Sequence, residues 1–271
     1  MKRDPGYVTG ILIIKMIRNI FLRLFISAAF IYIALCSWLY LKQRSMQYFP
    51  TPAPVNVEAQ KFELPSDGLL LNGWVINPGK QRAMIYFGGN GEAVEYNAEV
   101  FKKTLPDVSV YLLPYRSYSG NPGEVSEENC YRDALKLYDQ IKSRHHSINA
   151  LGRSLGSGVA TYLASQRKID KLILVTPYDS MLNVAQEKYP IFPVSLLLKD
   201  GYESWRQAPV IQSDVLVLIA GLDEIIPRAS TDNLLRHFRK KPKVIVFEKA
   251  GHNTLSDSIE YDLAVSEFIG R

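Results

Sequence analysis

The sequence predicts an α/β fold in which helices cover both faces of a mainly parallel sheet. Short, continuously apolar segments recur along the chain after residue 68, as in strands that are buried on both faces. Longer segments with amphipathic helical spacing separate most of them, and this alternation is typical of parallel β-α-β units. The 271 residues, 47% of them apolar, suffice for one sizeable core plus an appendage, or for two small domains.

The first element is predicted to be a transmembrane helix within an N-terminal segment of residues 1–44. Residues 24–41 carry no charge and would span about 27 Å as a helix, close to the ~30 Å hydrocarbon layer of a bilayer. Five basic residues precede this span and two closely follow it. The positive-inside rule therefore predicts a single-pass protein with a cytoplasmic N-terminus and a catalytic domain on the outer, periplasmic or lumenal, side. A cleaved signal peptide is the alternative, although the apolar run is long for one.

Charge and cysteine content exclude several function classes. The formal net charge is +5, but residues 1–44 hold seven basic residues and one acidic residue, which leaves the remainder with one net negative charge. The main domain therefore shows no sign of nucleic-acid binding. Cys36 and Cys130 lie far apart, so no disulfide framework or metal-ligand spacing is present. We expect neither a metal nor a cofactor, and the oligomeric state is left open.

The remaining elements follow in order. Residues 45–66, with four prolines, are predicted to be an extended linker, and residues 67–271 the folded domain. Strands are expected at residues 69–76, 83–87, 108–113, 148–151, 172–175, 215–220 and 244–247, the first two being candidates for an antiparallel orientation. Helices are expected at residues 93–103, 126–144, 155–166, 230–238 and 256–269. About forty residues between the fifth and sixth strands contain apolar stretches, which form either a short cap over a binding site or a cover for the sheet edge.

A candidate nucleophile lies in residues 152–156, which read GRSLG and match the GxSxG motif. A motif this short also arises by chance. Its place between a predicted strand and a predicted helix makes it a candidate nucleophile elbow, a sharp turn that leaves no room for side chains two residues before and after Ser154. Gly152 and Gly156 meet that need. The alternative is a glycine-rich turn whose serine only caps the helix.

Two other strand ends carry a carboxylate and an imidazole. Asp223 follows the strand at residues 215–220, and His252 follows the strand at residues 244–247. The carboxyl ends of parallel strands meet at one edge of a sheet, so we expect both side chains near Ser154. Taken alone, Asp223 is also explained as a turn residue and His252 as a surface residue. Their order along the chain, serine then aspartate then histidine, is the order expected of α/β-hydrolases.

These three residue types suit acyl transfer. A serine hydroxyl attacks well only when a base removes its proton, and this predicts His252 as the base that later protonates the leaving group. Asp223 is expected to hold the other ring nitrogen and to stabilise the imidazolium. The other histidines, which follow or lie within predicted helices, are expected to be structural or surface residues: His145, His146 and His237.

Acyl transfer also needs preset donors for a developing oxyanion, each typically worth about 3 kcal/mol. The backbone N–H of Leu155, directly after the nucleophile, is predicted to be one donor. The loop after the strand at residues 83–87 is expected to supply the second, with the backbone of Asn90 favoured over that of Gly89. The same loop has a rival interpretation as a dinucleotide-binding fingerprint, but Val94 takes the third glycine position and no ribose-binding acid follows the next strand.

From residue 45 to its C-terminus the chain resembles the bud-emergence (Bem) type of α/β-hydrolases, which are membrane-tethered serine hydrolases often described as serine-aminopeptidase-like. The matching stretches are QYFP at 47–50, FGGN at 87–90, YRSYSG at 115–120, GRSLG at 152–156, GLDEIIP at 221–227 and AGHN at 250–253. Members of this family usually have a histidine where Gly88 stands and an aspartate where Pro114 stands. Neither departure removes Ser154, Asp223 or His252.

The resemblance implies a serine hydrolase that acts on an ester, a thioester or a peptide. With the apolar cap, it predicts a membrane-anchored enzyme that cleaves short- to medium-chain carboxylic esters of a small-molecule or lipid-like acyl substrate. The alternative is a membrane-anchored hydrolase fold that binds without catalysis, which the residues at 88 and 114 favour.

Overall fold

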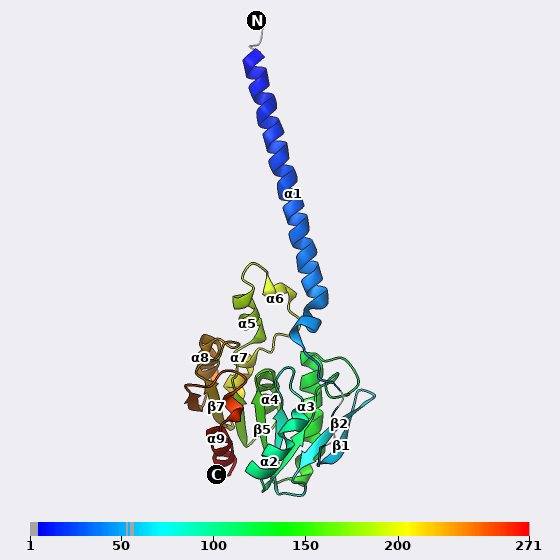
Figure 1. Cartoon of the computed structure of the whole chain (residues 1–271), viewed down its shortest axis with the longest axis vertical. Helices are drawn as coiled ribbons and strands as arrows, with labels where there is room; N and C mark the ends of the chain where they lie inside the picture. The colour runs from blue at the N-terminus through cyan, green and yellow to red at the C-terminus, as the bar shows by residue number, and fades with distance from the viewer. Residues whose placement is uncertain (1–4, 53, 55–56, 271) are drawn as a thin grey trace. The chain divides into compact units, whose positions relative to one another are not determined.

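The structure is a computed structural model that describes residues 5–52, 54 and 57–270. The chain divides into two compact units, Met1–Gln43 and Arg44–Arg271. Figure 1 follows the elements along the chain by colour, from α1 in blue to α9 in red.

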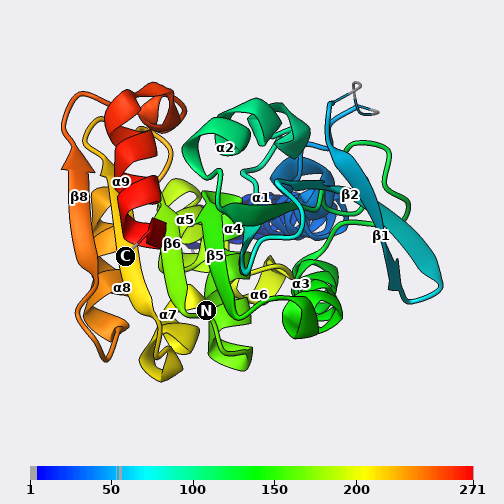
Figure 2. The ribbon, with the colours of Figure 1, turned by 90° about the horizontal axis from the view of Figure 1, so that it is seen from below.

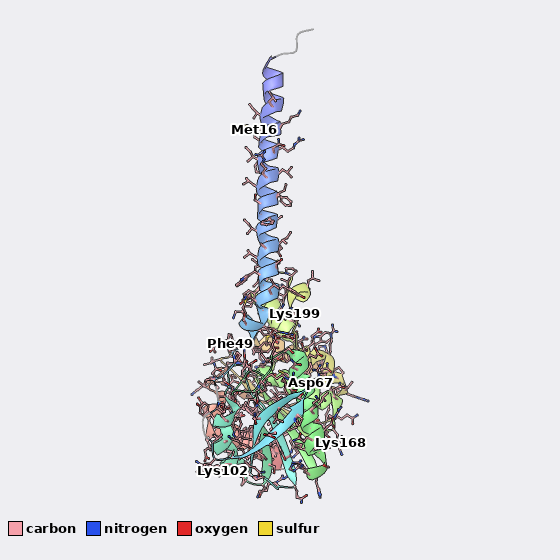
Figure 3. The ribbon with its side chains drawn as sticks, turned by 90° about the vertical axis from the view of Figure 1, so that its right-hand side faces the viewer. Met16, Phe49, Asp67, Lys102, Lys168 and Lys199 are labelled. Atoms are coloured by element: carbon pink, nitrogen blue, oxygen red, sulfur yellow. The ribbon has the colours of Figure 1, made fainter. Side chains whose placement is uncertain are left out.

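The first unit is formed by α1 (Pro5–Gln47), whose last turn belongs to the second unit. Within the described residues, one helix, Lys15–Gln47, is long and apolar enough to cross a membrane, and its 18-residue apolar window has a mean hydropathy of 2.1. Its large apolar side chains are exposed, Phe30 by 73% and Leu41 by 76%, and sticks project all round the helix in Figure 3. A helix that is apolar on every side needs an apolar surrounding, as a membrane anchor or a signal sequence has.

Within the described part of the second unit, the strands form one eight-stranded sheet. In spatial order the strands are β1 (Gln60–Ser66), β2 (Leu69–Ile76), β4 (Val108–Leu112), β3 (Arg82–Phe87), β5 (Ser147–Arg153), β6 (Lys171–Val175), β7 (Asp214–Ala220) and β8 (Lys243–Phe247). Strands β3 to β8 are parallel, whereas β2 is antiparallel to both β1 and β4. The mainly parallel sheet predicted from the apolar runs is therefore confirmed.

The first strands differ from the expectation in two ways. Strand β1 lies inside the predicted linker, residues 45–66, and pairs with β2 through a tight Asp67-Gly68 turn in which both residues have positive φ. Its sequence alternates between exposed and buried residues and contains Pro65, which a sheet edge tolerates because one side of an edge strand is unpaired. Strand β3 is parallel to β4 and β5, so only β2 of the two suggested strands is antiparallel within the sheet.

Helices cover both faces of the sheet (Figure 2). On one face α3 (Glu127–Ile141), α4 (Leu155–Gln166) and α8 (Arg228–His237) contribute Leu137, Leu163 and Leu234 to one apolar core. On the other face α2 (Ala98–Thr104) and α9 (Ile259–Gly270) contribute Phe101 and Val265 to a second core. The strands between them are buried on both sides, which explains their continuous apolar sequences.

The segment between β6 and β7 forms three short α-helices, α5 (Met181–Lys188), α6 (Val194–Leu197) and α7 (Ser204–Gln207), and a 3-10 helix, η3 (Ala208–Val210). Figure 1 shows α5 and α6 together at one end of the second unit. The Ser180 hydroxyl accepts a hydrogen bond from the Asn183 N–H and so caps the start of α5. These helices are too short for a periodic pattern to predict them.

Candidate active site

Four loops at the carboxyl ends of the parallel strands carry the residues singled out in the sequence. Asn90 follows β3, Ser154 follows β5, Asp223 follows β7 and His252 follows β8. The strand order places β3 beside β5 and β7 beside β8, so the four loops lie along one edge of the sheet.

Ser154 occupies a strained turn between β5 and α4. Its φ is +49° and its ψ is −115°, a conformation that a non-glycine residue rarely adopts. Close approach of the backbone explains the glycines on either side: a Cβ on Gly152 would lie 2.3 Å from the Gly156 oxygen, and one on Gly156 would lie 2.1 Å from the Phe87 oxygen. Residues 152–156 therefore have the geometry of a nucleophile elbow.

The structure brings Ser154, His252 and Asp223 into one hydrogen-bonded chain. His252 Nε2 lies 2.9 Å from Ser154 Oγ, and His252 Nδ1 lies 2.9 and 3.0 Å from the two carboxylate oxygens of Asp223. The His252 side chain is 6% exposed and that of Asp223 is 9% exposed. Water is thus largely excluded from the pair, which strengthens the interaction between them.

Asp223 is held as a carboxylate. Burial raises the pKa of its carboxyl, but hydrogen bonds from His252 and from the N–H groups of Ile226 and Ile225 outweigh burial, so the net pKa is lowered. The two backbone N–H groups bond to Oδ1 at 2.8 and 2.9 Å. Asp223 is therefore a turn residue whose carboxylate also bonds to His252, and the turn orients the carboxylate toward the imidazole.

Backbone contacts hold the two loops that carry Asp223 and His252 together. The N–H of Gly221 donates to the Phe247 oxygen and that of Leu222 to the Ala250 oxygen, each at 2.9 Å. A Cβ on Gly221 would lie 2.6 Å from the Glu248 oxygen, so only glycine allows the loops to come this close. Asp223 and His252, although 29 residues apart, are therefore set by one rigid junction.

The backbone donors expected for an oxyanion lie in the other two loops. Leu155 is the first residue of α4, so its N–H has no acceptor within the helix. The Gly89 N–H already donates to Glu92 Oε2 at 2.7 Å, which favours the backbone of Asn90 over that of Gly89 as the second donor. Gly89 also lies close to Ser154, since a Cβ on it would be 3.7 Å from Ser154 Cβ.

Glu92 links these loops, and sequence reasoning did not find it. One carboxylate oxygen accepts from the Gly89 N–H and from Arg153 Nη1 at 2.8 Å, and the other accepts from the Tyr86 hydroxyl and from Asn97 Nδ2. Arg153 in turn donates to Asn253 Oδ1 at 3.2 Å, next to His252. A single carboxylate thus connects the oxyanion loop, the elbow and, through Arg153, the histidine loop.

The Asn90 side chain is tied to the segment that follows α1. Its Oδ1 accepts from the Phe49 N–H at 3.0 Å and from the Tyr118 hydroxyl at 2.7 Å, and its Nδ2 donates to the Gln47 oxygen at 2.6 Å. This side chain is therefore occupied in orienting the loop, which leaves only its backbone N–H for an oxyanion.

Close packing accounts for the residue at position 88. A Cβ on Gly88 would lie 2.5 Å from Val94 Cγ1, so a larger side chain would require the loop to shift. The loop is braced by other contacts, because the Tyr115 hydroxyl donates to the Gly88 oxygen at 2.8 Å and Glu92 holds Gly89. The glycine does not leave this loop unsupported.

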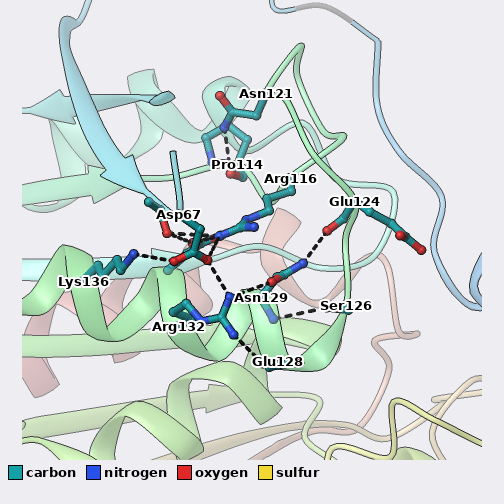
Figure 4. A network of polar contacts seen from close by, with 12 residues as sticks. Asp67, Pro114, Arg116, Asn121, Glu124, Ser126, Glu128, Asn129, Arg132 and Lys136 are labelled. Carbon is teal, nitrogen blue, oxygen red and sulfur yellow. Dashed lines mark hydrogen bonds and ion pairs between the residues drawn. The ribbon is translucent and has the colours of Figure 1, made fainter. Parts of the chain in front are cut away.

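Position 114 is also braced. The Pro114 oxygen accepts from Asn121 Nδ2 at 2.9 Å, as Figure 4 shows. In the same region Arg116, 6% exposed, bonds to both Asp133 and Asp67 and so fixes the loop after β4 to α3 and to the β1–β2 turn. The buried network therefore holds this loop without an aspartate at 114.

Two of the other histidines contact groups outside this site. His145 lies between the Tyr111 hydroxyl and the Lys80 oxygen, and His237 contacts the Asn233 oxygen. Among residues 5–52, 54 and 57–270, no group of three or more His, Cys, Asp or Glu side chains is arranged to hold a metal ion.

The sequence was also compared with known proteins. No family model matches the chain. Uncharacterized protein MT2364 of Mycobacterium tuberculosis is 30% identical over 234 residues, which cover 80% of this chain and 83% of that protein. This chain belongs to the same family as that mycobacterial protein. The alpha/beta hydrolase domain-containing protein WAV2 of Arabidopsis thaliana is 24% identical over 208 residues, 68% of each chain.

Solved structures agree on the fold. The esterase Pf2001 of Pyrococcus furiosus aligns with a TM-score of 0.66 and 17% identity, over 82% of this chain and 99% of its own. Est1E of Butyrivibrio proteoclasticus aligns with a TM-score of 0.63 and 17% identity, over 77% of this chain and 97% of its own. At these identities the likeness concerns the fold, and the second unit has the α/β-hydrolase fold.

Proposed function

We propose that this chain is a membrane-anchored serine hydrolase that cleaves carboxylic esters, with Ser154 as nucleophile, His252 as base and Asp223 as the acid that orients it. The observation that carries the proposal is the continuous hydrogen-bonded chain from Asp223 through both ring nitrogens of His252 to Ser154 Oγ. The strained elbow that presents Ser154 and the esterases among the structures of the same fold support it.

The reaction follows from these contacts. Ser154 Oγ attacks the ester carbonyl while its proton passes to His252 Nε2, and the Asp223 carboxylate, whose pKa is lowered, stabilises the resulting imidazolium. The backbone N–H groups of Leu155 and Asn90 donate to the oxyanion of the tetrahedral intermediate. The proton on Nε2 then passes to the leaving alcohol, which leaves an acyl-enzyme, and a water repeats the sequence to release the acid.

Membership in the Bem type of α/β-hydrolases is part of the proposal. The family stretches have structural roles here, since QYFP and FGGN meet through the bonds between Asn90 and the backbone at Gln47 and Phe49. The hydrogen bonds that Glu92 and Tyr115 make to the loop of Gly88 and Gly89 support a catalytic role. We therefore favour catalysis over a binding-only role.

The experiment that tests the proposal combines an active-site probe with a substrate panel. The full chain and Ser154→Ala are treated with a fluorophosphonate probe, then assayed with p-nitrophenyl esters of two to twelve carbons, matching thioesters and aminoacyl amides. We expect the probe to label Ser154 alone and the esters to be turned over, both lost in Ser154→Ala. Preference for thioesters or amides would change the substrate class, and an unlabelled Ser154 would support a binding-only protein.

A further inference from the structure

An apolar surface lies on the cap, which we define as residues 181–199, from α5 through α6 to the residue before Asp200. Leu196 is 79% exposed and Ile191 is 72% exposed, the highest values among the large apolar side chains described for Arg44–Arg271. Tyr189, 45% exposed, lies two residues before Ile191. Single exposed apolar residues are common, but such a concentration within eight residues marks a surface with an apolar partner.

The end of the cap is fixed to the residues that follow the proposed membrane span. Arg44 Nε donates to Asp200 Oδ2 at 3.0 Å, and Gln47 Nε2 donates to the Asp200 oxygen at 2.9 Å. Asp200 is 3% exposed, and its hydrogen bond to Arg44 is the main reason that the pKa of Arg44 is raised above its usual range. This ion pair, in which Asp200 is buried and the Arg44 side chain is 36% exposed, keeps Arg44 beside the cap.

The length of the chain limits how far the cap can lie from a bilayer. The uncharged span ends at Leu41, three residues before Arg44. Three residues reach at most about 11 Å even when fully extended, and the headgroup layer on each side of a bilayer is about 5–8 Å thick. Arg44 and Asp200 therefore lie at the headgroups or just outside them, whichever way the second unit is turned.

The same segment leads to the candidate active site. Phe49 is 58% exposed and its N–H bonds to Asn90, whose backbone is the proposed oxyanion donor. Leu222 and Ile225, on either side of Asp223, are 63% and 52% exposed. Figure 3 shows Phe49 and Lys199 toward one end of the second unit and Lys102 and Lys168 toward the other. Apolar side chains are thus exposed beside the triad as well as on the cap.

We propose that the cap is a second membrane contact of this chain, in which Ile191 and Leu196 enter the bilayer. The occupant of this surface is the lipid bilayer. A second inference rests on the proposed function: the substrate is an acyl ester that lies in the membrane. It reaches Ser154 without crossing bulk water.

The contact is tested by the depth of a fluorescent label in the full chain. A Cys36→Ser chain with Leu196→Cys is labelled with the fluorophore NBD in phosphatidylcholine vesicles. Cys130 is buried and should not react, and Lys168→Cys is the exposed control. We expect blue-shifted emission at position 196 that lipids with nitroxides on their acyl chains quench, and neither effect at 168. A label at 196 that behaves like the control, or is shielded only by a second copy of the chain at high protein density, overturns the proposal.

The substrate class is tested by comparing a lipid-embedded ester with a water-soluble one. For Leu196→Glu, we expect the ratio of turnover on the vesicle ester to turnover on the soluble ester to fall by about tenfold or more, because the charge opposes insertion. Ile259→Glu is the matched control, since Ile259 is 65% exposed outside the cap, and should leave the ratio unchanged. An unchanged ratio for Leu196→Glu contradicts delivery from the membrane. Absence of turnover on both esters counts against the proposed function instead, and the quenching result still decides the membrane contact.

Discussion

The backbone of Ser154 is held in a strained conformation. A non-glycine residue at φ +49° stores about 1–3 kcal/mol of strain, which persists only where neighbouring contacts over-determine the turn. Here the Ser154 N–H donates to the Val175 oxygen at 2.9 Å, and Gly156 packs directly on the Phe87 backbone. The strain keeps the hydroxyl at the carboxyl edge of the sheet, within reach of His252.

The substitution Asp223→Asn tests the proposed role of the Asp223 carboxylate in orienting His252. The amide can donate to His252 Nδ1, which places the proton on Nε2 and removes the base that Ser154 needs. We expect kcat to fall on the order of 10⁴-fold with little change in KM. Steady-state hydrolysis and the rate of fluorophosphonate labelling measure the effect.

Glu224→Gln is the control for that substitution, because it is the adjacent exposed carboxylate in the same loop. It should keep nearly full activity. A small effect of Asp223→Asn, equal to that of Glu224→Gln, would mean that Asp223 only shapes the turn.

Some residues of the candidate site could be predicted from the sequence, and others could not. The meeting of Ser154, Asp223 and His252 could be predicted because each directly follows an apolar strand, and parallel strands bring such ends together. Glu92 and Arg153 were missed because their contact joins positions 61 residues apart and has no local pattern. The one available signal was a carboxylate within the predicted oxyanion loop, residues 88–92.

At the scale of elements, Glu92 joins the loops after β3 and β5. For Glu92→Gln we expect the Gly89 loop and the elbow to lose their shared charged contact and kcat to fall on the order of 10²-fold, because small misplacements of preset donors are costly. KM should change little, because both oxygens of the Glu92 carboxylate are already bonded to groups of the protein. Kinetics on a soluble ester, together with the melting temperature, separate this effect from loss of stability.

Glu99→Gln is the matched control, being an exposed glutamate on α2 whose ion pair with Lys102 is 3.8 Å long. It should leave kcat unchanged. If both variants retain full kcat, Glu92 has only a structural role.

The β1–β2 turn should contribute to stability in a pH-dependent way. Lys136, Arg132 and Arg116 each donate a hydrogen bond to Asp67, and in that order they hold the pKa of its carboxyl well below the usual range (Figure 4). A lowered pKa in the folded state means that the stabilisation is complete above the unfolded pKa of about 4 and is lost as the pH falls from there toward the folded value.

Asp67→Asn removes this charge while keeping the turn, because asparagine tolerates positive φ. We expect lower stability than the native chain at pH 7 and a difference that shrinks below pH 4, measured by urea unfolding across pH. Asp107→Asn, at an exposed ion pair with Lys80 of 3.9 Å, is the control. A difference that stays constant from pH 7 to pH 2 would contradict the assignment.

The hairpin of β1 and β2 shows which parts of the fold could not be predicted from the sequence. Runs such as β6 and β7 are apolar throughout and bounded by turns, so their positions could be predicted. Strand β1 could not be recognised, because a short edge strand with Pro65 and few buried residues resembles a linker, although Asp67-Gly68 was a usable hairpin signal. The orientation of β3 depends on which strand it pairs with, and that is decided by the whole sheet.

At the scale of the whole molecule, the charges around the apolar helix predict how the chain lies in a membrane. Arg44 bonds to Asp200 and Glu124 and therefore belongs to the folded unit. By the positive-inside rule, the excess of basic residues before residue 24 predicts a cytoplasmic N-terminus. The candidate active site should then face the outer side of the membrane, with α1 retained as an anchor.

Protease access in sealed membranes tests this orientation. With a tag at each end of the full chain, we expect both tags to stay with the membrane after an alkaline carbonate wash, because a spanning helix resists extraction. Protease added to intact right-side-out spheroplasts should remove the C-terminal tag and spare the N-terminal one. Loss of the N-terminal tag before protease is added indicates a cleaved signal sequence. A C-terminal tag that is protected until the membrane is broken reverses the orientation, and the proposed supply of substrate would then come from the cytoplasmic leaflet.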